Sequence, residues 1–592
     1  MTTSIARISD ISKIQSSILG LLIFTLFLSN SAAVAATDTS NTTAVESATP
    51  VKHLVVIFQE NVSFDHYFAT YPFALNPPGE PHFVPSPKTP SAVNNLRTAG
   101  LLNHNPNSAL PFRIDRSRSL VCDNNHTYTA EQNAYDGGKT DKFVESTFPP
   151  NPNYLFPYFI ACEKQGEMGY FDGNTVTALW NYAQHFAMSD NFFGSTFGPS
   201  TPGHINLVSG QTHGAVCVPT TRNMNCKAVV CSTIPINIKC KTDPQHPTND
   251  AITHGTMIYD PDPAFDDCSV SREDVAITHF IIPTNDAVPA YSKVYMQGKN
   301  IGDLLNDKRI TWGWFSTGFK PTPFTFTKNC GHNYHTPSLF SGVSVNDYYA
   351  NVEPFQYYKT TSNPHHLPPT SVSMIGHKGD QANHQYDISD FWNAAESGNL
   401  PAVSFLKAPS YQQEHPGISD PLLGQQFYVN VINRLQSLPE WDNMAVIITY
   451  DDSDGWYDHV IGPIINHSQD PVRDTLFGKE QLCLSTSPKT YQDRCGYGPR
   501  LPILIISPYA KVNYIDHSLT DTSSILRFIE DNWLGGQRIG DQSLDSKAGS
   551  IQNMFDFTNG PHVAKLFLDP STGKIIQSSH SRFPTVIRPF PF

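Results

Sequence analysis

The feature that most constrains the fold of this chain is a repeated alternation of short apolar runs with amphipathic stretches. The clearest apolar runs, each of the length and composition of a buried strand, are His53–Gln59, Ile310–Phe315, Ala402–Leu406, Ala445–Tyr450 and Pro502–Ser507. Helical patterns lie between them at Thr175–Ala187, Gln425–Leu438 and Ser523–Trp533. Strands that alternate with helices predict an α/β fold with a mostly parallel central sheet flanked by helices.

The N-terminal 35 residues have the pattern of a secretory signal peptide. Arg7 and Lys13 precede the apolar run Ile18–Leu28, and Ala33-Val34-Ala35 follows as a cleavage site. Because the run is too short to span a bilayer comfortably, we expect no stable membrane anchor and a secreted or periplasmic protein. Residues 36–50 then form a Ser/Thr/Ala linker, and residues 51–592 form the folded domain.

The chain has ten cysteines, all after the predicted signal peptide. An even number in an exported protein favours disulfides, and Cys483 and Cys495 could close a local loop. Five cysteines lie in the segment 217–300, which is rich in Cys, Asn and Pro and interrupts the strand–helix alternation, so we interpret it as an insertion or cap. The alternative is a zinc site formed by Cys226, Cys231 and Cys240, whose spacing does not match paired C-x-x-C ligands.

Charge excludes one class of partner. With 39 Lys+Arg against 53 Asp+Glu, the formal net charge is −14, and such a chain lacks the positive surface that a nucleic-acid backbone requires. The 23 histidines make this charge conditional, because exposed imidazoles gain a proton below about pH 6.5. We therefore expect an acidic optimum for any anionic substrate.

Polar residues follow two of the predicted strands at their carboxyl ends, where open parallel sheets bind ligands. Glu60-Asn61 follows the first run, and Asp451-Asp452 follows the fourth. These side chains supply the oxygen ligands that a divalent cation prefers, without selecting one ion. Ser200 lies in a Gly-Pro turn before a possible helix, where backbone N–H groups favour an anion. Together they predict a metal-assisted phosphoester site.

Each of these elements also has an ordinary structural explanation. Acidic pairs after strands commonly cap helices or lie in solvated turns, and a serine in a Gly-Pro turn is often only a turn residue. Asn61 begins an N-x-S sequon, so it could carry a glycan on a surface loop.

At these residues the sequence resembles the bacterial acid phosphatase and phospholipase C phosphoesterase family, whose fold is alkaline-phosphatase-like. The resemblance lies in VVIFQENVSFDHYFATYP (55–72), NFFGSTFGPSTPGHINLVSGQ (191–211), NHQYDISDFWNAAESGNLPAVSFLKAPSYQQEHPGISDP (383–421), ITYDDSDGWYDHV (448–460) and YGPRLPILIISPYAKVNYIDHSLTDTSSILRFIEDNW (497–533). The acid phosphatase branch is the more similar, because the phospholipase branch typically has an Asp-Glu pair in place of Asp451-Asp452 and G-P-T in place of Gly198-Pro199-Ser200.

The resemblance implies a set of roles. Ser200 would be the nucleophile, and one divalent metal ion would bind near its hydroxyl, held by Glu60, Asn61, Asp451 and Asp452. Four histidines match family residues that contact phosphate or protonate the leaving group: His126, His415 and the adjacent pair His365 and His366. Asp458 and His459 follow the metal pair closely and could brace it.

These roles predict an exported metal-dependent phosphoesterase that hydrolyses phosphate monoesters through a phosphoserine intermediate, that is, an acid phosphatase. The alternative is a phospholipase C, so the expected substrate is a small phosphorylated molecule or a phospholipid. A sulfatase is a weaker alternative, suggested by Ser200-Thr201-Pro202-Gly203-His204, and an inactive binding scaffold is another. The sequence does not indicate an oligomeric state.

Overall fold

The computed structural model describes residues 47–149, 162, 164–218, 229–230, 256–257, 259–269, 293–320, 333–335, 344–468, 474–476, 483 and 494–576. These residues belong to one structural unit, Val45–Phe592. The predicted signal peptide 1–35, most of the linker 36–50 and most of the segment 217–300 lie outside the described residues.

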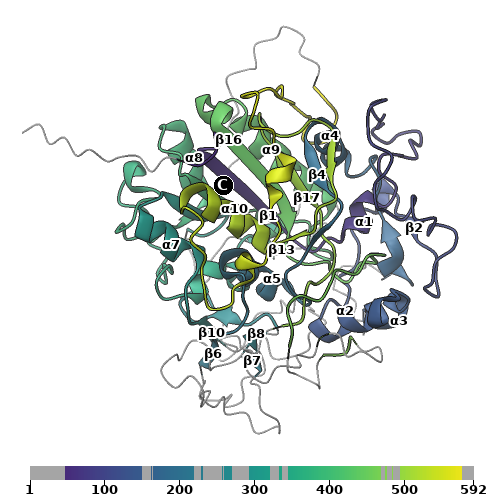
Figure 1. The fold of residues 1–592 in the computed structure, drawn as a ribbon, viewed down its shortest axis with the longest axis horizontal. Coiled ribbons are helices and arrows are strands. Elements are labelled where there is room, and N and C mark those ends of the chain that lie inside the picture. The colour runs from purple at the N-terminus through teal and green to yellow at the C-terminus, as the bar shows by residue number, and fades with distance from the viewer. Residues whose placement is uncertain are drawn as a thin grey trace, which may run out of the picture. The chain divides into compact units, whose positions relative to one another are not determined.

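A central sheet organises this unit (Figure 1). Its eight strands lie in the order β14 (Gln385–Asp387), β11 (Trp312–Ser316), β15 (Val403–Lys407), β1 (His53–Gln59), β16 (Met444–Tyr450), β17 (Ile503–Ile506), β4 (Ala187–Ser189) and β18 (Tyr514–Asp516). Only β17 runs against the others, because it pairs antiparallel with both β16 and β4, while every other pairing in this sheet is parallel. The predicted α/β class with a mostly parallel sheet is confirmed.

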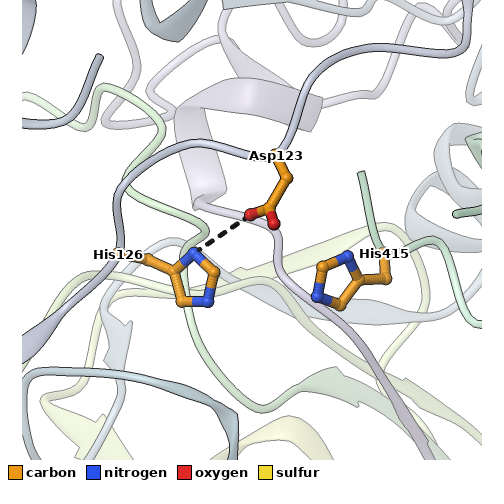
Figure 2. A group of neighbouring side chains, drawn as sticks. All are labelled: Asp123, His126 and His415. Atoms are coloured by element: carbon orange, nitrogen blue, oxygen red, sulfur yellow. Dashed lines mark ion pairs between the residues drawn. The ribbon is translucent and has the colours of Figure 1, made fainter. Parts of the chain in front are cut away.

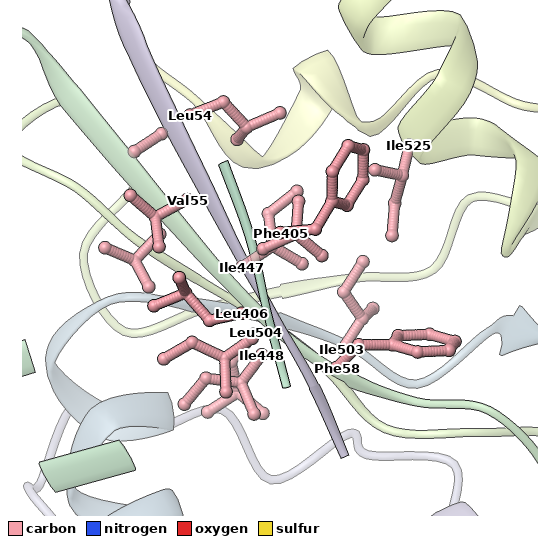
Figure 3. Packing of buried hydrophobic residues seen from close by; sticks show 14 of the residues in the cluster. Leu54, Val55, Phe58, Phe405, Leu406, Ile447, Ile448, Ile503, Leu504 and Ile525 are labelled. Carbon is pink, nitrogen blue, oxygen red and sulfur yellow. The ribbon is translucent and has the colours of Figure 1, made fainter. Parts of the chain in front are cut away.

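All five predicted apolar runs form strands of this sheet, and β1 has the predicted bounds. Their side chains build the core around the sheet (Figure 3). Leu54, Phe405, Ile447 and Leu504 are each fully buried, although they come from four different strands. The strands β14, β4 and β18 were not predicted, because three residues are too few to show a hydrophobic period.

Helices cover both faces of the sheet. The main ones are α4 (Thr177–His185), α5 (Ser200–Ser209), α7 (Ile301–Lys308), α8 (Ile388–Glu396), α9 (Pro421–Leu435) and α10 (Ser523–Trp533). Phe58 and Gln59 point to opposite faces of β1. The Phe58 ring packs edge-on against His204 of α5, whereas Gln59 reaches Glu414, which packs against Gly424 of α9. The helices α5 and α9 therefore lie on opposite sides of the sheet.

The predicted helices are present, and two of them have shifted bounds. Helix α10 has the predicted bounds, and α4 is slightly shorter than predicted. Helix α9 begins at Pro421, before the predicted Gln425, because the Asp420 side chain accepts hydrogen bonds from the N–H groups of Leu422 and Leu423. An acidic N-cap followed by proline at the first helical position is the start signal that the apolar periodicity missed.

The remaining elements are short. The helices are α1 (Phe64–Phe68), α2 (Tyr128–Tyr135) and α3 (Phe143–Ser146). The strands are β2 (Phe112–Arg113), β3 (Gly169–Tyr170), β5 (Phe192–Phe193), β6 (Ala215–Val218), β7 (Val229–Val230), β8 (Thr256–Met257), β9 (Asp262–Pro263), β10 (Lys293–Met296), β12 (Asn333–His335), β13 (Ser344–Asn346) and β19 (Thr520–Asp521). Turns of 3-10 helix lie at Arg116–Arg118, Asp136–Gly138, Gly166–Met168, Ala350–Val352, Pro354–Tyr357, Val372–Met374, Ser410–Gln412, Pro439–Asn443, Leu544–Ser546 and Ile551–Met554.

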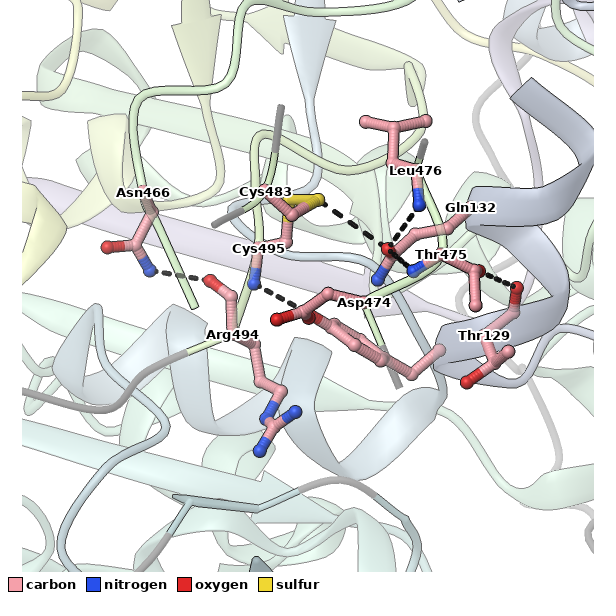
Figure 4. The surroundings of a disulfide bond; sticks show 10 residues. Thr129, Gln132, Asn466, Asp474, Thr475, Leu476, Cys483, Arg494 and Cys495 are labelled. Atoms are coloured by element: carbon pink, nitrogen blue, oxygen red, sulfur yellow. Dashed lines mark hydrogen bonds between the residues drawn. A yellow bond between two sulfur atoms is a disulfide. The ribbon is translucent and has the colours of Figure 1, made fainter. Parts of the chain in front are cut away.

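Disulfides join Cys122 to Cys162 and Cys483 to Cys495, and the second confirms the predicted local loop. The loop holds α2 (Figure 4). The Tyr128 hydroxyl accepts from the Cys495 N–H and donates to Asp474, which precedes the loop. Gln132 accepts from the N–H groups of Thr475 and Leu476, the two residues after Asp474. The alternative zinc ligands Cys226, Cys231 and Cys240 lie outside the described residues.

No helix among the described residues has the length and apolar character needed to cross a bilayer.

Candidate active site

The candidate site lies at the carboxyl ends of β1 and β16, which are neighbours in the sheet. Glu60 and Asn61 follow β1, and Asp451 and Asp452 follow β16, so parallel pairing brings all four together. All four are at least 97% buried. The Asn61 N–H donates to Asp451 Oδ1 over 3.0 Å, which ties the two strand ends to each other. This burial is incompatible with a glycan on Asn61.

Ser200 is the first residue of α5, and its hydroxyl faces these strand ends. Ser200 Oγ donates to Asp452 Oδ2 over 3.0 Å and lies 3.4 Å from Asn61 Oδ1. Gly203 permits this approach, because a Cβ atom there would come within 2.4 Å of the Asp451 carbonyl oxygen. The structure thus brings the predicted nucleophile together with the predicted metal ligands.

Two basic residues that were not predicted for the site complete it. Lys407, the last residue of β15, forms a buried ion pair with Glu60. His204, on α5, lies 3.4 Å from Asp451 Oδ2 and 3.6 Å from Glu60 Oε1. Burial alone would raise the pKa of Asp451, but His204 and Lys407 hold it well below its usual value. Both residues carried a usable signal, since Lys407 ends a buried run and His204 follows the nucleophile by one helical turn.

The side chains at this place fit a divalent cation. Glu60, His204 and Asp451 offer ligand atoms that all lie within 4.8 Å of one another, and Asn61 Oδ1 and Ser200 Oγ add two oxygens beside them. Burial raises the pKa of Asp452, and the adjacent Asp451 charge raises it further. Two buried carboxylates in sequence are the kind of charge concentration that a bound cation relieves.

Two of the predicted histidines lie together beside this centre (Figure 2). The rings of His126 and His415 have centroids 6.2 Å apart, and both rings are buried with Asp123. His126 Nδ1 lies 2.9 Å from the Asn124 carbonyl oxygen and 3.4 Å from Asp454 Oδ1. Asp454 also accepts from the Asn61 amide over 3.2 Å, so His126 is connected to the predicted metal ligands through one carboxylate.

The hydrogen bonds of these two histidines set their tautomers. Nδ1 of His415 lies 2.7 Å from the Pro416 carbonyl oxygen, just as Nδ1 of His126 contacts a carbonyl. Because a carbonyl oxygen can only accept, Nδ1 carries a proton in both rings. Nε2 is therefore the atom of each ring that can gain and lose a proton in a reaction.

The other two predicted histidines are placed differently. His365 is exposed and pairs with Asp267, while His366 is buried between Asp266, 2.8 Å from Nε2, and the Phe319 carbonyl oxygen, 2.6 Å from Nδ1. Burial opposes the charged form of His366, but Asp266 raises its pKa above the usual value. Within the described part of the chain, neither histidine has a hydrogen bond or ion pair to Ser200 or to the four strand-end residues.

Cys268 also lies beside His366, with its Sγ 3.2 Å from Nε2. Cys268 is disulfide-bonded, so the group Asp266, Cys268 and His366 has no thiolate to offer a metal.

Asp458 and His459 belong to a separate ionic cluster. Asp458 accepts from the buried guanidinium of Arg500, and His459 Nδ1 lies 2.5 Å from Asp65 Oδ2. Arg500 also reaches the backbone carbonyl oxygens of Asn94 and Asp190. This cluster joins the segments after β1, β4 and β16, so its contacts support the surrounding loops and not the predicted metal ligands directly.

Comparison with known proteins identifies the family. Residues 51–534 match the family model described as "Phosphoesterase family". A "Non-hemolytic phospholipase C" of Pseudomonas aeruginosa is 21% identical over 86% of this chain and 58% of its own length. A "Phospholipase C B" of Mycobacterium tuberculosis is 22% identical over 88% of this chain and 80% of its own.

A further relative, a "Non-hemolytic phospholipase C" of Burkholderia pseudomallei, is 23% identical over 81% of this chain and 55% of its own length. The chain therefore spans little more than half the length of two of these relatives. Among solved structures, murine ectonucleotide pyrophosphatase/phosphodiesterase 5 shares 9% identity over 64% of this chain and 95% of its own, with a TM-score of 0.28. The family match covers most of the chain and includes both strand ends, Ser200 and the two buried histidines, and so the chain belongs to the phosphoesterase family.

Proposed function

We propose that this protein hydrolyses phosphoric esters with Ser200 as nucleophile, and that its substrates are phosphodiesters of the phospholipid headgroup type. The observation that carries the first part is the hydrogen bond from Ser200 Oγ to Asp452 Oδ2 at the N-terminus of α5. A hydroxyl with a carboxylate acceptor, next to helix N–H groups, suits attack on an anionic phosphorus centre.

In the first step Ser200 Oγ attacks phosphorus and its proton passes to Asp452 Oδ2. The Oγ–P bond forms while the bond from phosphorus to the leaving alkoxide breaks. A bound divalent cation, held by Glu60, Asn61, Asp451 and Asp452 with His204 beside them, would neutralise charge on the phosphoryl oxygens. Lys407 would add a further positive charge near Glu60.

The buried histidines would complete the reaction. Nε2 of His415 or His126, when protonated, gives its proton to the leaving oxygen, while the Nδ1 contacts to backbone carbonyls keep the rings oriented. Water then gives a proton to the now neutral Nε2 and attacks phosphorus in the covalent intermediate. The Oγ–P bond breaks, Ser200 Oγ takes its proton back from Asp452, and the phosphorylated product leaves. His365 and His366 need a change of partner to contact substrate, because the described structure engages them with Asp267 and Asp266.

The relatives favour the diester substrate. Those compared above are named phospholipase C, which supports the alternative that the sequence left open more than it supports the acid phosphatase reading. Monoester hydrolysis remains the second candidate, favoured by the Ser200 nucleophile and the Asp451-Asp452 pair that resemble the acid phosphatase branch. We also propose that the protein is exported, as its N-terminal 35 residues predict.

A substrate panel tests the proposal. The purified protein would be assayed from about pH 4 to 9 on phosphatidylcholine micelles and on p-nitrophenyl phosphate, with its metal content measured. Release of phosphocholine from phosphatidylcholine, together with acid-quenched Ser200 carrying a phosphocholine group detected by mass spectrometry, is the expected result. Hydrolysis of the monoester alone would overturn the substrate class, and hydrolysis of neither ester would overturn the function.

A further inference from the structure

A carboxylate from the Cys-rich segment 217–300 reaches the candidate site. Asp260 Oδ1 accepts from the backbone N–H of Thr201 over 2.7 Å, and Thr201 directly follows the proposed nucleophile. Asp260 also interacts electrostatically with His126 and Asp451. The Asp260 carboxylate therefore lies at the first turn of α5, near His126.

The backbone that directly follows Asp260 is held in place by several contacts. The carbonyl oxygen of Pro261 accepts from the Tyr357 hydroxyl, and Asp262–Pro263 forms strand β9, which pairs with β10. The N–H of Ala264 donates to the Val294 carbonyl oxygen over 2.8 Å. Because these contacts fix the neighbouring residues, the Asp260 carboxylate has a defined position beside Ser200.

The negative charge of Asp260 is not needed to neutralise Lys407 and His204. The carboxylates of Glu60 and Asp451 already face Lys407 and His204, and a neutral oxygen would suffice to accept from the Thr201 N–H. A negative charge on Asp260 instead repels the substrate, because the phosphoryl oxygens of a bound ester also approach the N-terminus of α5. The pKa of Asp260 is raised, because burial and the Asp451 charge outweigh the opposing effects of the Thr201 hydrogen bond and of His126.

We propose that Asp260 is a specificity-determining residue that disfavours dianionic phosphate monoesters relative to monoanionic phosphate diesters. A monoester carries close to two negative charges above its second pKa of about 6, whereas a diester carries one. Repulsion by a fixed carboxylate grows with the charge of the substrate, so the penalty on the monoester is about twice as large. This inference rests on the proposed phosphoesterase function and deepens it toward diesters.

The test compares two esters with the same leaving group at about pH 8, above the second phosphate pKa. The substrates are p-nitrophenyl phosphate and methyl p-nitrophenyl phosphate. Asp260→Asn, which keeps an oxygen acceptor for the Thr201 N–H, should raise kcat/KM for the monoester about tenfold relative to the diester, a change typical of removing one adjacent charge. Asp307→Asn, which removes an exposed carboxylate on α7, should leave that ratio unchanged.

Binding gives a readout that does not need turnover. Calorimetry with inorganic phosphate and with dimethyl phosphate should show that Asp260→Asn tightens phosphate about tenfold and changes dimethyl phosphate little. If Asp260→Asn folds poorly, Asp260→Ser supplies a second neutral variant. An unchanged preference in both assays, with Asp260→Ala impaired equally on both esters, would show that Asp260 only caps α5 and would overturn the inference. A wild-type protein that cleaves neither ester would overturn the proposed function instead, and the phosphate titration would still decide the role of Asp260.

Discussion

Ser200 Oγ and Asp452 Oδ2 are joined by a 3.0 Å hydrogen bond, although 252 positions separate the two residues in the chain. The contact exists because α5 begins where β16 ends, and Gly203 lets the helix approach the strand end. It gives the proposed nucleophile a proton acceptor before any substrate binds.

Replacement of Ser200 by alanine should therefore remove turnover while leaving the fold and the metal site in place. We expect kcat to fall by about a thousandfold or more, because the proposed covalent intermediate forms on the Ser200 hydroxyl. Activity on both ester classes, circular dichroism and metal content check this.

The matched control is Ser209→Ala at the other end of α5, whose hydroxyl donates to the Ile205 carbonyl oxygen. That variant should keep most of the activity. Near-normal turnover in Ser200→Ala would contradict the assignment of Ser200 as the nucleophile.

Asp451→Asn should lose bound metal and activity together. The substitution removes one of two buried carboxylates that lie with His204 and Glu60 in the predicted metal site. Elemental analysis after dialysis, with the rate measured on the same sample, checks the coupling. Asp390→Asn, on α8, is a control that removes a mostly buried carboxylate elsewhere, and full metal occupancy in Asp451→Asn would contradict the ligand set.

His415→Gln should slow cleavage of esters with poor leaving groups more than cleavage of p-nitrophenyl esters. If His415 Nε2 protonates the leaving oxygen, its loss costs about a hundredfold or more for an alkoxide. A p-nitrophenolate leaves without a proton, so its rate should fall far less. His185→Gln, whose ring contacts the Ala564 carbonyl oxygen on the surface, serves as the control, and equal losses on both esters would argue against an acid role.

The protein should be more stable at mildly acidic pH than at alkaline pH. Burial raises the pKa of Glu414 to about 8, so between about pH 4.5 and 8 the folded state holds a proton that the unfolded chain releases. Asp266 raises the pKa of His366 above 6.5 although burial opposes it. The stability from charged His366 is complete below pH 6.5 and disappears as pH rises through its folded value. Both groups make stability fall with rising pH.

Thermal unfolding between pH 5 and 8.5 measures this slope. Glu414→Gln, which is neutral at every pH, should unfold at a higher temperature than the wild type near pH 8.5 and at a similar temperature near pH 5. A melting temperature that rises steadily toward pH 8.5 would refute the prediction.

Removal of the Cys483–Cys495 disulfide by a double Ser substitution should destabilise the protein by about 3 kcal/mol, the typical effect for a short loop. Because the Cys495 N–H bonds to Tyr128 of α2, and His126 lies just before this helix, activity should fall at temperatures where the loop loosens. Denaturant unfolding and residual activity at 25 and 45 °C would be compared, and an unaffected unfolding midpoint would show that the disulfide is dispensable.

The sequence predicted structure and site best where a continuous apolar run was followed directly by a polar residue. The run His53–Gln59 has five consecutive apolar residues, Leu54–Phe58, and Glu60 follows it directly, so both the strand and the site residue after it were predicted with their bounds. The position of Lys407 after a buried run marked it as a candidate, but its ion pair with Glu60 could not be predicted, because that contact depends on β15 lying next to β1. Strand order is a property of the whole sheet, and hydrophobic periodicity does not encode it.

The four predicted histidines show the same limit, because the sequence does not say which distant residues become neighbours. His126 and His415 lie together, yet they come from loops before α2 and α9, and the sequence alone gave no distance between them. His365 and His366 were predicted from the family pattern, but their partners Asp266 and Asp267 belong to the segment that no family motif covered. Asp260 was missed for the same reason.

The parallel pairing of β1 with β16 also has a consequence for how the chain reaches its native state. Gln59 lies beside Tyr450 in the register, so the site cannot form until β16 and the residues after it have been synthesised and two segments 390 positions apart have met. Contacts of such long sequence separation are slow to form, since the entropy of closing the loop is lost before the contact is gained. Recovery of catalytic activity should thus be the last event of refolding, and the appearance of activity after dilution from denaturant would time the closure of the central sheet.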